Sequence, residues 1–221
     1  MKILGIIPAR FASSRFPGKP LAQIDGKSMI RRVYEQAIKS SRLSDVIVAT
    51  DDERIADEVS AFGGKFAFTS DTHLSGTDRC AEVVAGNPGF DAAINIQGDE
   101  PYIDPSQIDL LASCFENQDV QIATLIKVID AQEELFNTNI PKVVINHRGQ
   151  AVYFSRQTIP YLRNHDQENW LSVHQFYKHI GIYGYTCSTL AEITRLKPST
   201  LELSESLEQL RWVEHGYAIQ T

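Results

Sequence analysis

Three cations lie close together in one short segment near the N-terminus. Residues 8–20 read PARFASSRFPGKP, and Arg10, Arg15 and Lys19 are the only charged residues among them. Arginine can fork onto phosphate oxygens, lysine supplies a compact charge, and loop N–H groups add further donors. Like charges on one loop repel each other unless an anion neutralises them. The segment therefore favours a polyanion-binding loop over a merely solvated connection.

The same segment excludes two common kinds of nucleotide site. It contains neither the GxxxxGK[ST] phosphate loop nor the GxGxxG dinucleotide fingerprint. A standard NTPase or dehydrogenase is therefore disfavoured.

An acidic turn forms the second candidate site. The sequence QGDEP at 97–101 follows a strongly apolar run, and we predict that Asp99 binds Mg²⁺ bridging to a triphosphate. Glu100 precedes a proline and is expected to point elsewhere. Taken alone, the turn is equally typical of a cap for the helix expected at 104–115. Beside a cationic phosphate loop, the metal site is the better interpretation.

The elements that would position these residues follow from hydrophobic periodicity. Apolar runs at 3–7, 46–49 and 92–96 predict buried strands. Segments with helical spacing at 28–38 and 55–62 alternate with them, which indicates βαβ units. In open α/β sheets, ligands bind beyond the carboxyl ends of the strands, where both the basic loop and the acidic turn must lie.

The second half of the chain has a different pattern. Residues 143–154 are typical of a hairpin, 179–185 of a further strand and 203–213 of a late amphipathic helix. We predict one α/β domain over 1–221, with a mixed, mostly parallel sheet between helices. Residues 140–185 would form an insertion that carries the hairpin.

Composition limits the classes of function. The 221 residues carry 21 Lys and Arg against 28 Asp and Glu, a net charge of −7, which disfavours a nucleic-acid partner. Apolar residues make up 43%, as in ordinary globular proteins. No apolar run reaches the length of a membrane span, and the three cysteines form no CxxC motif. We expect a cytoplasmic protein without a membrane partner.

Seven motifs resemble those of a known family. The first, PAR–S–R–PGKPL at 8–21, resembles the signature loop of sugar-activating cytidylyltransferases. Taken together, the motifs resemble the 3-deoxy-manno-octulosonate (Kdo) cytidylyltransferases, from residue 3 to about residue 217. The other six are ATDD at 49–52, SGTDR at 75–79, INIQGDEP at 94–101, YFSR at 153–156, HIGIYGY at 179–185 and LEQLR at 207–211.

The resemblance implies a fold of the nucleotide-diphospho-sugar-transferase, glycosyltransferase-A-like type. It implies CTP and Kdo as substrates, CMP-Kdo and diphosphate as products for lipopolysaccharide synthesis, Mg²⁺ as cofactor and a homodimer. The catalytic residues would be Arg10, Lys19 and Asp99, with Asp99 as the metal ligand. Nucleotide binding would fall to Ala9, Arg10, Arg15, Lys19, Ser75, Gly76 and Arg79. The sugar pocket would be lined by Gln97, Arg156, His179, Tyr183, Glu208 and Gln209.

One departure concerns the metal. Sequences of the resembled family continue beyond the position of Thr221 into a Val-Asp-Thr-Pro-Glu-Asp-Leu-like segment, whose first aspartate completes the metal site. The present sequence ends at Thr221. We therefore expect Asp99 to supply one of two carboxylates.

Two rival functions remain open from the residues alone. The shared first loop also fits a cytidylyltransferase for sialic acid or an amino-Kdo analogue. A non-catalytic nucleotide-binding module is the rival of a different class. Without the resemblance, His179 in an apolar strand is typical of a core histidine, Tyr183 of sheet packing, and Glu208 and Gln209 of a solvated helix.

Overall fold

The computed structural model describes residues 1–12 and 16–221, which form two compact units. Unit 1 comprises Met1–Asp119 and Ile182–Thr194, and unit 2 comprises Val120–Gly181 and Arg195–Thr221. Strand β10 (Tyr177–Thr186) contributes residues to both units. The single domain expected over 1–221 stays a prediction.

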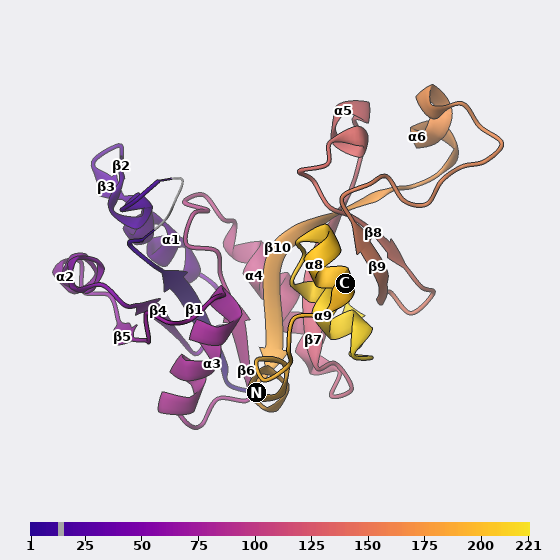
Figure 1. Cartoon of the computed structure of the whole chain (residues 1–221). Coiled ribbons are helices and arrows are strands. Elements are labelled where there is room, and N and C mark those ends of the chain that lie inside the picture. The colour runs from indigo at the N-terminus through magenta and orange to yellow at the C-terminus, as the bar shows by residue number, and fades with distance from the viewer. Residues whose placement is uncertain (13–15) are drawn as a thin grey trace. The chain divides into compact units, whose positions relative to one another are not determined.

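Unit 1 is an α/β layer structure around a mostly parallel sheet (Figure 1). The strand order is β10-β6-β1-β4-β5; the last four strands are parallel, and β10 runs antiparallel to β6. This confirms the predicted fold class. The elements are β1 (Ile3–Ala9), η1 (Lys19–Leu21), β2 (Gln23–Ile24), β3 (Lys27–Ser28), α1 (Met29–Ala37), β4 (Asp45–Thr50), α2 (Glu53–Ala61), β5 (Phe66–Phe68), α3 (Gly76–Gly86), β6 (Ala92–Asn95), α4 (Pro105–Ser113), η2 (Cys114–Glu116) and α7 (Cys187–Ile193).

Helices of unit 1 cover both faces of its sheet. The crossover from β1 through α1 to β4 and the crossover from β5 through α3 to β6 run in opposite directions across the sheet. Because such crossovers are right-handed, α1 and α3 lie on opposite faces, as Figure 1 shows. The core strands are buried on both sides, which explains why their sequences are continuous apolar runs rather than alternating ones.

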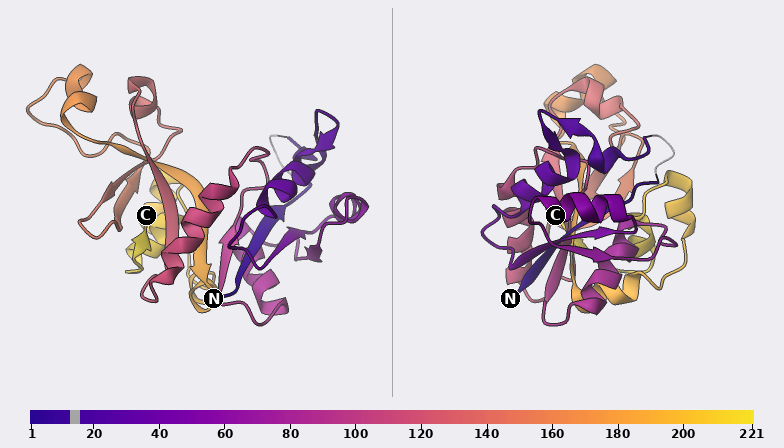
Figure 2. Two further views of the ribbon diagram at one scale, coloured as in Figure 1. Left: turned by 180° about the vertical axis from the view of Figure 1, so that it is seen from behind. Right: turned by 90° about the vertical axis from the view of Figure 1, so that its left-hand side faces the viewer.

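Local sequence signals set the ends of these helices. The Ser28 side chain accepts a hydrogen bond from the Arg31 backbone N–H at the start of α1, as expected from the sequence. After α2 the chain turns at Gly63, whose φ is 77°, a conformation that favours glycine. At Gly184 in β10, an added Cβ would lie 2.6 Å from the Phe115 ring, so the strand packs closely against η2, which directly follows α4. Helix α4 lies beside the strand in Figure 2.

Unit 2 contains a hairpin, several short helices and a small strand pair. The hairpin strands β8 and β9 confirm the predicted hairpin, and β8 also pairs antiparallel with β10 through Tyr177 and Val143. Strands β11 and β7 are parallel. The elements are β7 (Ile122–Val128), α5 (Gln132–Phe136), β8 (Lys142–Ile145), β9 (Ala151–Ser155), η3 (Gln167–Asn169), α6 (Trp170–Val173), α8 (Thr200–Glu205), α9 (Gln209–Glu214) and β11 (Ile219–Gln220).

The late helix departs from the sequence prediction. Instead of one helix over 203–213, the structure has α8 and α9 separated at Ser206, whose φ of 52° lies in the left-handed region. A non-glycine residue in this region costs free energy, so contacts around it must hold it there. Those contacts come from Arg156, described below.

None of the described helices combines the length and the hydrophobicity that crossing a bilayer requires.

Candidate active site

A cavity of about 530 Å³ opens at the carboxyl end of β1 in unit 1. It lies where the sequence places the basic loop and the acidic turn, and both contribute to its walls. This confirms that the two candidate motifs meet at one edge of the sheet. The lining residues are Pro8, Ala9, Arg10, Phe16, Lys19, Pro20, Gln97, Gly98 and Asp99.

Lys19 and Asp99 form an ion pair within this cavity. Lys19 Nζ donates to Asp99 Oδ2 at 2.6 Å, and the Asp99 side chain is 51% exposed. In water-exposed surroundings such a pair contributes little to stability. Its significance is therefore chemical, because an ammonium and an accessible carboxylate, held together, both line the cavity.

Glycine at position 98 allows the acidic turn to approach β1. A Cβ there would lie 2.7 Å from the carbonyl oxygen of Pro8, closer than real Cβ atoms come to backbone. The turn therefore packs directly against the end of β1, and this contact holds Asp99 beside the basic loop. The alternative interpretation of the turn as a helix cap is not needed, because Asp104 caps α4 by accepting from the Ser106 N–H.

Glu100 differs from its neighbour in environment. Burial, together with the nearby charge of Asp99, raises the pKa of the Glu100 carboxyl. A carboxyl with a raised pKa is a poorer ligand for a hard cation than an exposed, ionised one. Asp99 is thus the better metal candidate of the two, and its role as a ligand stays a prediction.

A smaller cavity of about 190 Å³ shares part of its wall with the first. Both are lined by Pro8, Ala9, Arg10 and Gln97. The smaller cavity is completed by the start of α3, so those predicted nucleotide-binding residues that the structure describes lie together in unit 1. The residues that line it besides the shared four are His73, Leu74, Ser75, Gly76 and Arg79.

The N-terminus of α3 is stabilised by side-chain capping. Ser75 and Asp78 form a capping box, in which the Ser75 side chain accepts from the Asp78 N–H and the Asp78 carboxylate accepts from the Ser75 N–H. Arg79, in the first turn, is 4% exposed and yet lines the cavity. Arg15, the remaining predicted nucleotide ligand, lies outside the described residues.

The donor set around Asp99 fits a magnesium ion held largely by substrate. Within residues 1–12 and 16–221, no three His, Cys, Asp or Glu side chains gather closely enough to bind a metal alone. Mg²⁺ commonly takes one or two carboxylates and fills its other positions with water and phosphate oxygens. Lys19 occupies one carboxylate oxygen of Asp99, so the site as built suits an ion that arrives with a nucleotide.

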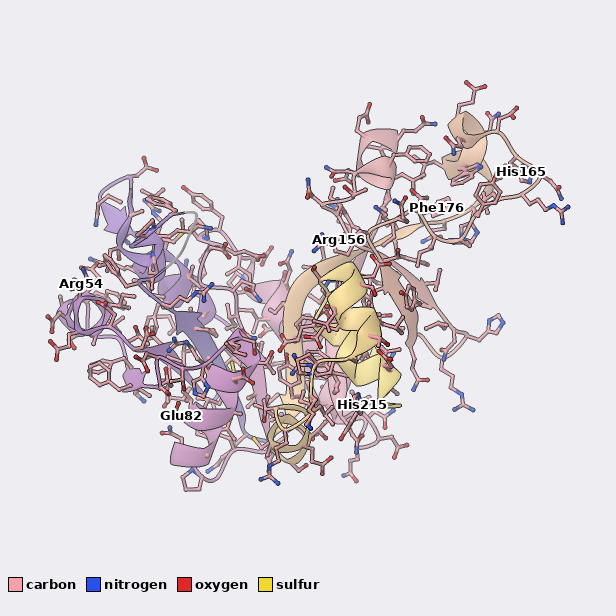
Figure 3. All side chains as sticks on the ribbon, viewed as in Figure 1. Arg54, Glu82, Arg156, His165, Phe176 and His215 are labelled. Atoms are coloured by element: carbon pink, nitrogen blue, oxygen red, sulfur yellow. The ribbon has the colours of Figure 1, made fainter. Side chains whose placement is uncertain are left out.

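Arg156, predicted to bind the sugar, forms a clamp in unit 2. It lies directly after β9 beside α8, as labelled in Figure 3. Its Nε donates to the Glu205 carbonyl at 2.7 Å and its Nη2 to the Ser206 carbonyl at 3.1 Å. Its Nη1 donates to the Thr138 carbonyl at 3.3 Å. These bonds hold the left-handed turn at Ser206, and each terminal nitrogen keeps a second N–H.

His179 is held as a neutral imidazole. Its Nε2 lies 3.0 Å from the Thr124 hydroxyl oxygen, which is also 3.2 Å from the Ile180 carbonyl oxygen. The Phe154 ring packs edge-on against the imidazole. Burial lowers the pKa of His179 to about 4.

The other predicted sugar residues fall into both units. Glu208 precedes α9, and Gln209 is buried, with its Nε2 lacking a hydrogen-bond partner among the described residues. A buried amide donor without a partner is costly, which is consistent with a position that a ligand satisfies. Gln97 and Tyr183 belong to unit 1, where Tyr183 stacks on Tyr185.

Two residues of interest escaped the sequence reasoning. Lys142 in β8 is fully buried, and its Nζ donates to the Asn137 carbonyl at 2.9 Å. Burial and the charge of Arg156 lower its pKa. His73 lines the smaller cavity and hydrogen-bonds to Glu82. For Lys142, the available signal was a lysine next to an apolar strand run. For His73 the sequence held no signal, because its contact with Glu82 is set by the tertiary fold.

Comparison with known proteins settles the family. A family model described as "Cytidylyltransferase" matches residues 4–219. A protein of Cytophaga hutchinsonii named 3-deoxy-manno-octulosonate cytidylyltransferase is 58% identical over all of this chain and 89% of its own length. A protein of the same name from Bacteroides thetaiotaomicron is 57% identical, with the same coverage. The chain belongs to the 3-deoxy-manno-octulosonate cytidylyltransferase family.

Solved structures agree with this assignment. One titled as CMP:2-keto-3-deoxy-manno-octonic acid synthetase complexed with CTP superposes with a TM-score of 0.93 at 43% identity, covering all of this chain and 89% of that one. A cytidylyltransferase from Leptospira borgpetersenii is 16% identical with a TM-score of 0.61, over 98% of this chain and 74% of that one, and shows the shared fold. The family expected from the motifs is therefore confirmed.

Proposed function

We propose that this chain transfers the cytidylyl group of CTP to Kdo, producing CMP-Kdo and diphosphate for lipopolysaccharide synthesis. The observation that carries the proposal is the cavity at the end of β1, where a cationic loop and the Asp99 carboxylate face the same space. The names of the relatives support the substrates CTP and Kdo. They also favour an enzyme over a non-catalytic nucleotide-binding module.

CTP would bind across the two adjoining cavities. Arg10 and Lys19 would neutralise the triphosphate in the larger cavity, together with Arg15 of the same loop. Ala9 would contribute through its backbone. The cytidine would enter the smaller cavity, against Ser75, Gly76 and Arg79. Because the two cavities share a wall, one nucleotide can occupy both.

Asp99 would hold Mg²⁺ once a nucleotide is bound. When present, the ion would draw charge from the α-phosphate and make the phosphorus a better electrophile. Replacement of Asp99 by Asn should lower turnover and raise the Mg²⁺ concentration that gives half-maximal rate. The measurement is initial rate against Mg²⁺ concentration at saturating CTP. An unchanged Mg²⁺ dependence would exclude Asp99 as ligand.

The reaction needs no covalent bond to the protein. The anomeric hydroxyl of Kdo attacks the α-phosphorus, the new P–O bond forms as the bond to diphosphate breaks, and the hydroxyl proton passes to solvent water. Lys19 and Arg10 stabilise the charge that develops on the phosphoryl group and on the departing diphosphate. Positioning and charge neutralisation thus account for the catalysis.

The sugar would be recognised by polar groups suited to a polyhydroxylated acid. Arg156 can still offer one N–H from each terminal nitrogen to the carboxylate, while its other donors hold the turn at Ser206. His179, kept neutral, and the buried amide of Gln209 suit hydroxyl groups. Within unit 2, Glu208, directly before α9, would add a further polar group to this set.

Diphosphate release in the presence of CTP and a panel of sugar acids tests this function. Kdo should support release, whereas sialic acid should not; an amino-Kdo analogue is the closest competitor. Release with sialic acid alone would replace Kdo by the rival substrate. Absence of release with every acid, in protein that binds CTP, would favour the nucleotide-binding module.

Two further properties belong to the proposal. We place the protein in the cytoplasm because its cysteines, Cys80, Cys114 and Cys187, are all free thiols. We also propose a homodimer. It is supported by exposed apolar side chains in the segment of unit 2 between β9 and β10, such as Tyr161 and Val173. Sedimentation equilibrium that gives only the monomer mass at micromolar concentration would contradict the dimer.

A further inference from the structure

Arg79, which lines the smaller cavity, belongs to a buried ion pair. Arg79 Nη2 donates to Asp51 Oδ2 at 2.8 Å, and its Nη1 donates to the Thr69 hydroxyl oxygen at 2.6 Å. The side chains of Arg79 and Asp51 are 4% and 16% exposed. Asp51 directly follows β4 and Thr69 directly follows β5. The guanidinium is therefore held by two acceptors that come from the ends of neighbouring strands.

The backbone fixes the two acceptors relative to each other. The Thr69 N–H donates to the Thr50 carbonyl at 2.8 Å, which ties the segment after β5 to the residue that precedes Asp51. Arg79 itself lies in the first turn of the capped helix α3. The guanidinium is thus bound by two acceptors whose backbones are joined, and we infer that these contacts set its plane.

This arrangement is not what stability alone would select. Burying two opposite charges costs desolvation that the pair recovers only in part, and apolar residues of similar size often serve as well. In addition, Asp51 Oδ1 is buried without a hydrogen-bond partner among the described residues. A costly pair of this kind is best explained by what Arg79, which lines the 190 Å³ cavity, does there.

The chemistry of a fixed guanidinium discriminates between pyrimidines. Arginine offers five N–H donors and no acceptor, and the two described contacts leave others available. Cytosine presents two adjacent acceptors, N3 and O2, on the edge beside its glycosidic bond. Uracil carries a hydrogen on N3 and would oppose the guanidinium with a donor. A guanidinium held in a fixed plane can therefore favour cytosine over uracil.

We propose that Asp51 is a positioning residue that fixes Arg79 to read the cytosine base of CTP. The inference rests on the proposed function, because it requires the cytidine to occupy the smaller cavity. Asp51 is not among the residues that line the smaller cavity, so the proposal gives it no contact with the substrate. Its effect reaches the nucleotide only through the orientation and the charge balance of Arg79.

Replacement of Asp51 by Asn tests the proposal in steady-state kinetics. The substitution keeps the size of the side chain but removes the charge that holds the guanidinium. The KM for CTP should rise about tenfold or more, as expected for the loss of a charge-assisted hydrogen bond, and the preference for CTP over UTP should fall. The KM for Kdo and the kcat at saturating CTP should remain within about twofold of wild type.

A matched control comes from the other end of the same strand. Asp45 begins β4 and pairs with Lys65 at an exposed position, so Asp45→Asn removes an equivalent charge away from the cavities. This variant should keep wild-type kinetics for CTP and UTP. Thr69→Val removes the second acceptor without changing shape much. It should lower the CTP preference in the same direction as Asp51→Asn, and it decides the question if circular dichroism shows that Asp51→Asn is unfolded.

The outcomes separate the two levels of inference. Wild-type protein that releases no diphosphate from CTP and Kdo contradicts the proposed function itself. Active wild-type protein, with unchanged CTP affinity and unchanged CTP preference in the folded variants, overturns only the role of Asp51. Equal losses for CTP, UTP and Kdo would also overturn it, because they would show general damage to the fold. A rise in KM confined to CTP supports it.

Discussion

At the scale of single residues, the site depends on cationic side chains whose positions are fixed by hydrogen bonds to other residues. Lys19 is paired with Asp99, Arg79 with Asp51, and Arg156 with three carbonyl oxygens. Each cation is thus oriented before a substrate arrives, which lowers the reorganisation that binding and reaction would otherwise require.

Replacement of Lys19 by Ala tests the role of the exposed ammonium. We expect kcat/KM for CTP to fall by about 10² or more, because a charge aimed at the developing phosphoryl anion is lost. Lys65→Ala, which removes an exposed lysine paired with Asp45, should leave the kinetics unchanged. Wild-type values of kcat and KM in folded Lys19→Ala would exclude the basic loop from the site.

The depressed pKa of His179 predicts a pH dependence of stability. Its folded pKa is about 4, below the ordinary 6.5. Between these values the unfolded chain binds the proton and the folded chain does not, so stability falls as the pH drops below about 6.5. From about pH 7 to pH 5, this single group should lower the free energy of unfolding by roughly 2 kcal/mol.

Urea denaturation of wild type and His179→Gln at both pH values measures this contribution. Subtracting the two proteins removes the effect of carboxyl groups that also titrate in this range. The wild type should lose more stability than the variant on acidification. Equal losses would show that His179 titrates normally in the folded protein.

At the scale of elements, Gly98 joins the acidic turn to β1. Gly98→Ala would place a Cβ 2.7 Å from the Pro8 carbonyl oxygen, so either the turn or the end of the strand must move. We expect kcat/KM to fall about tenfold or more, because Asp99 is displaced from the basic loop. Gly86→Ala is the control: a Cβ there meets nothing within 4 Å, at the last residue of α3.

That control should keep full activity and equal or higher thermal stability, since alanine restricts the unfolded chain more than glycine does. If Gly98→Ala were as active as Gly86→Ala, the close approach would have no part in positioning Asp99.

Elements also show where sequence reasoning succeeds and where it stops. The apolar runs predicted β1, β4 and β6, because strands that are buried on both faces have continuous apolar sequences. The capping serine predicted the start of α1. The break at Ser206 left none, since it is held by Arg156, a residue far away in the chain. The partnership of Asp51 with Arg79 was likewise invisible, because it depends on which strand ends meet.

At the scale of the whole molecule, charge distribution predicts a salt effect. The chain has a net charge of −7, which repels an anionic nucleotide, and its loop cations must attract CTP locally. Raising the ionic strength from about 0.05 M to 0.5 M shortens the range of these interactions. We expect the KM for CTP to rise severalfold over this range, and to rise less in Arg10→Gln. Identical salt dependence in both proteins would mean that Arg10 does not attract the triphosphate.

The division of the chain into units affects how the protein is made. Unit 1 is discontinuous, because Ile182–Thr194 returns to it after the first segment of unit 2 has been synthesised. A nascent chain that has left the ribosome up to Asp119 lacks the strand that pairs with β6. At about 5–20 residues per second, several seconds pass before β10 emerges. During that interval the edge of β6 that β10 will cover is unpaired. The growing chain can therefore pair with the wrong strand, a risk that a unit made of one continuous segment would not have.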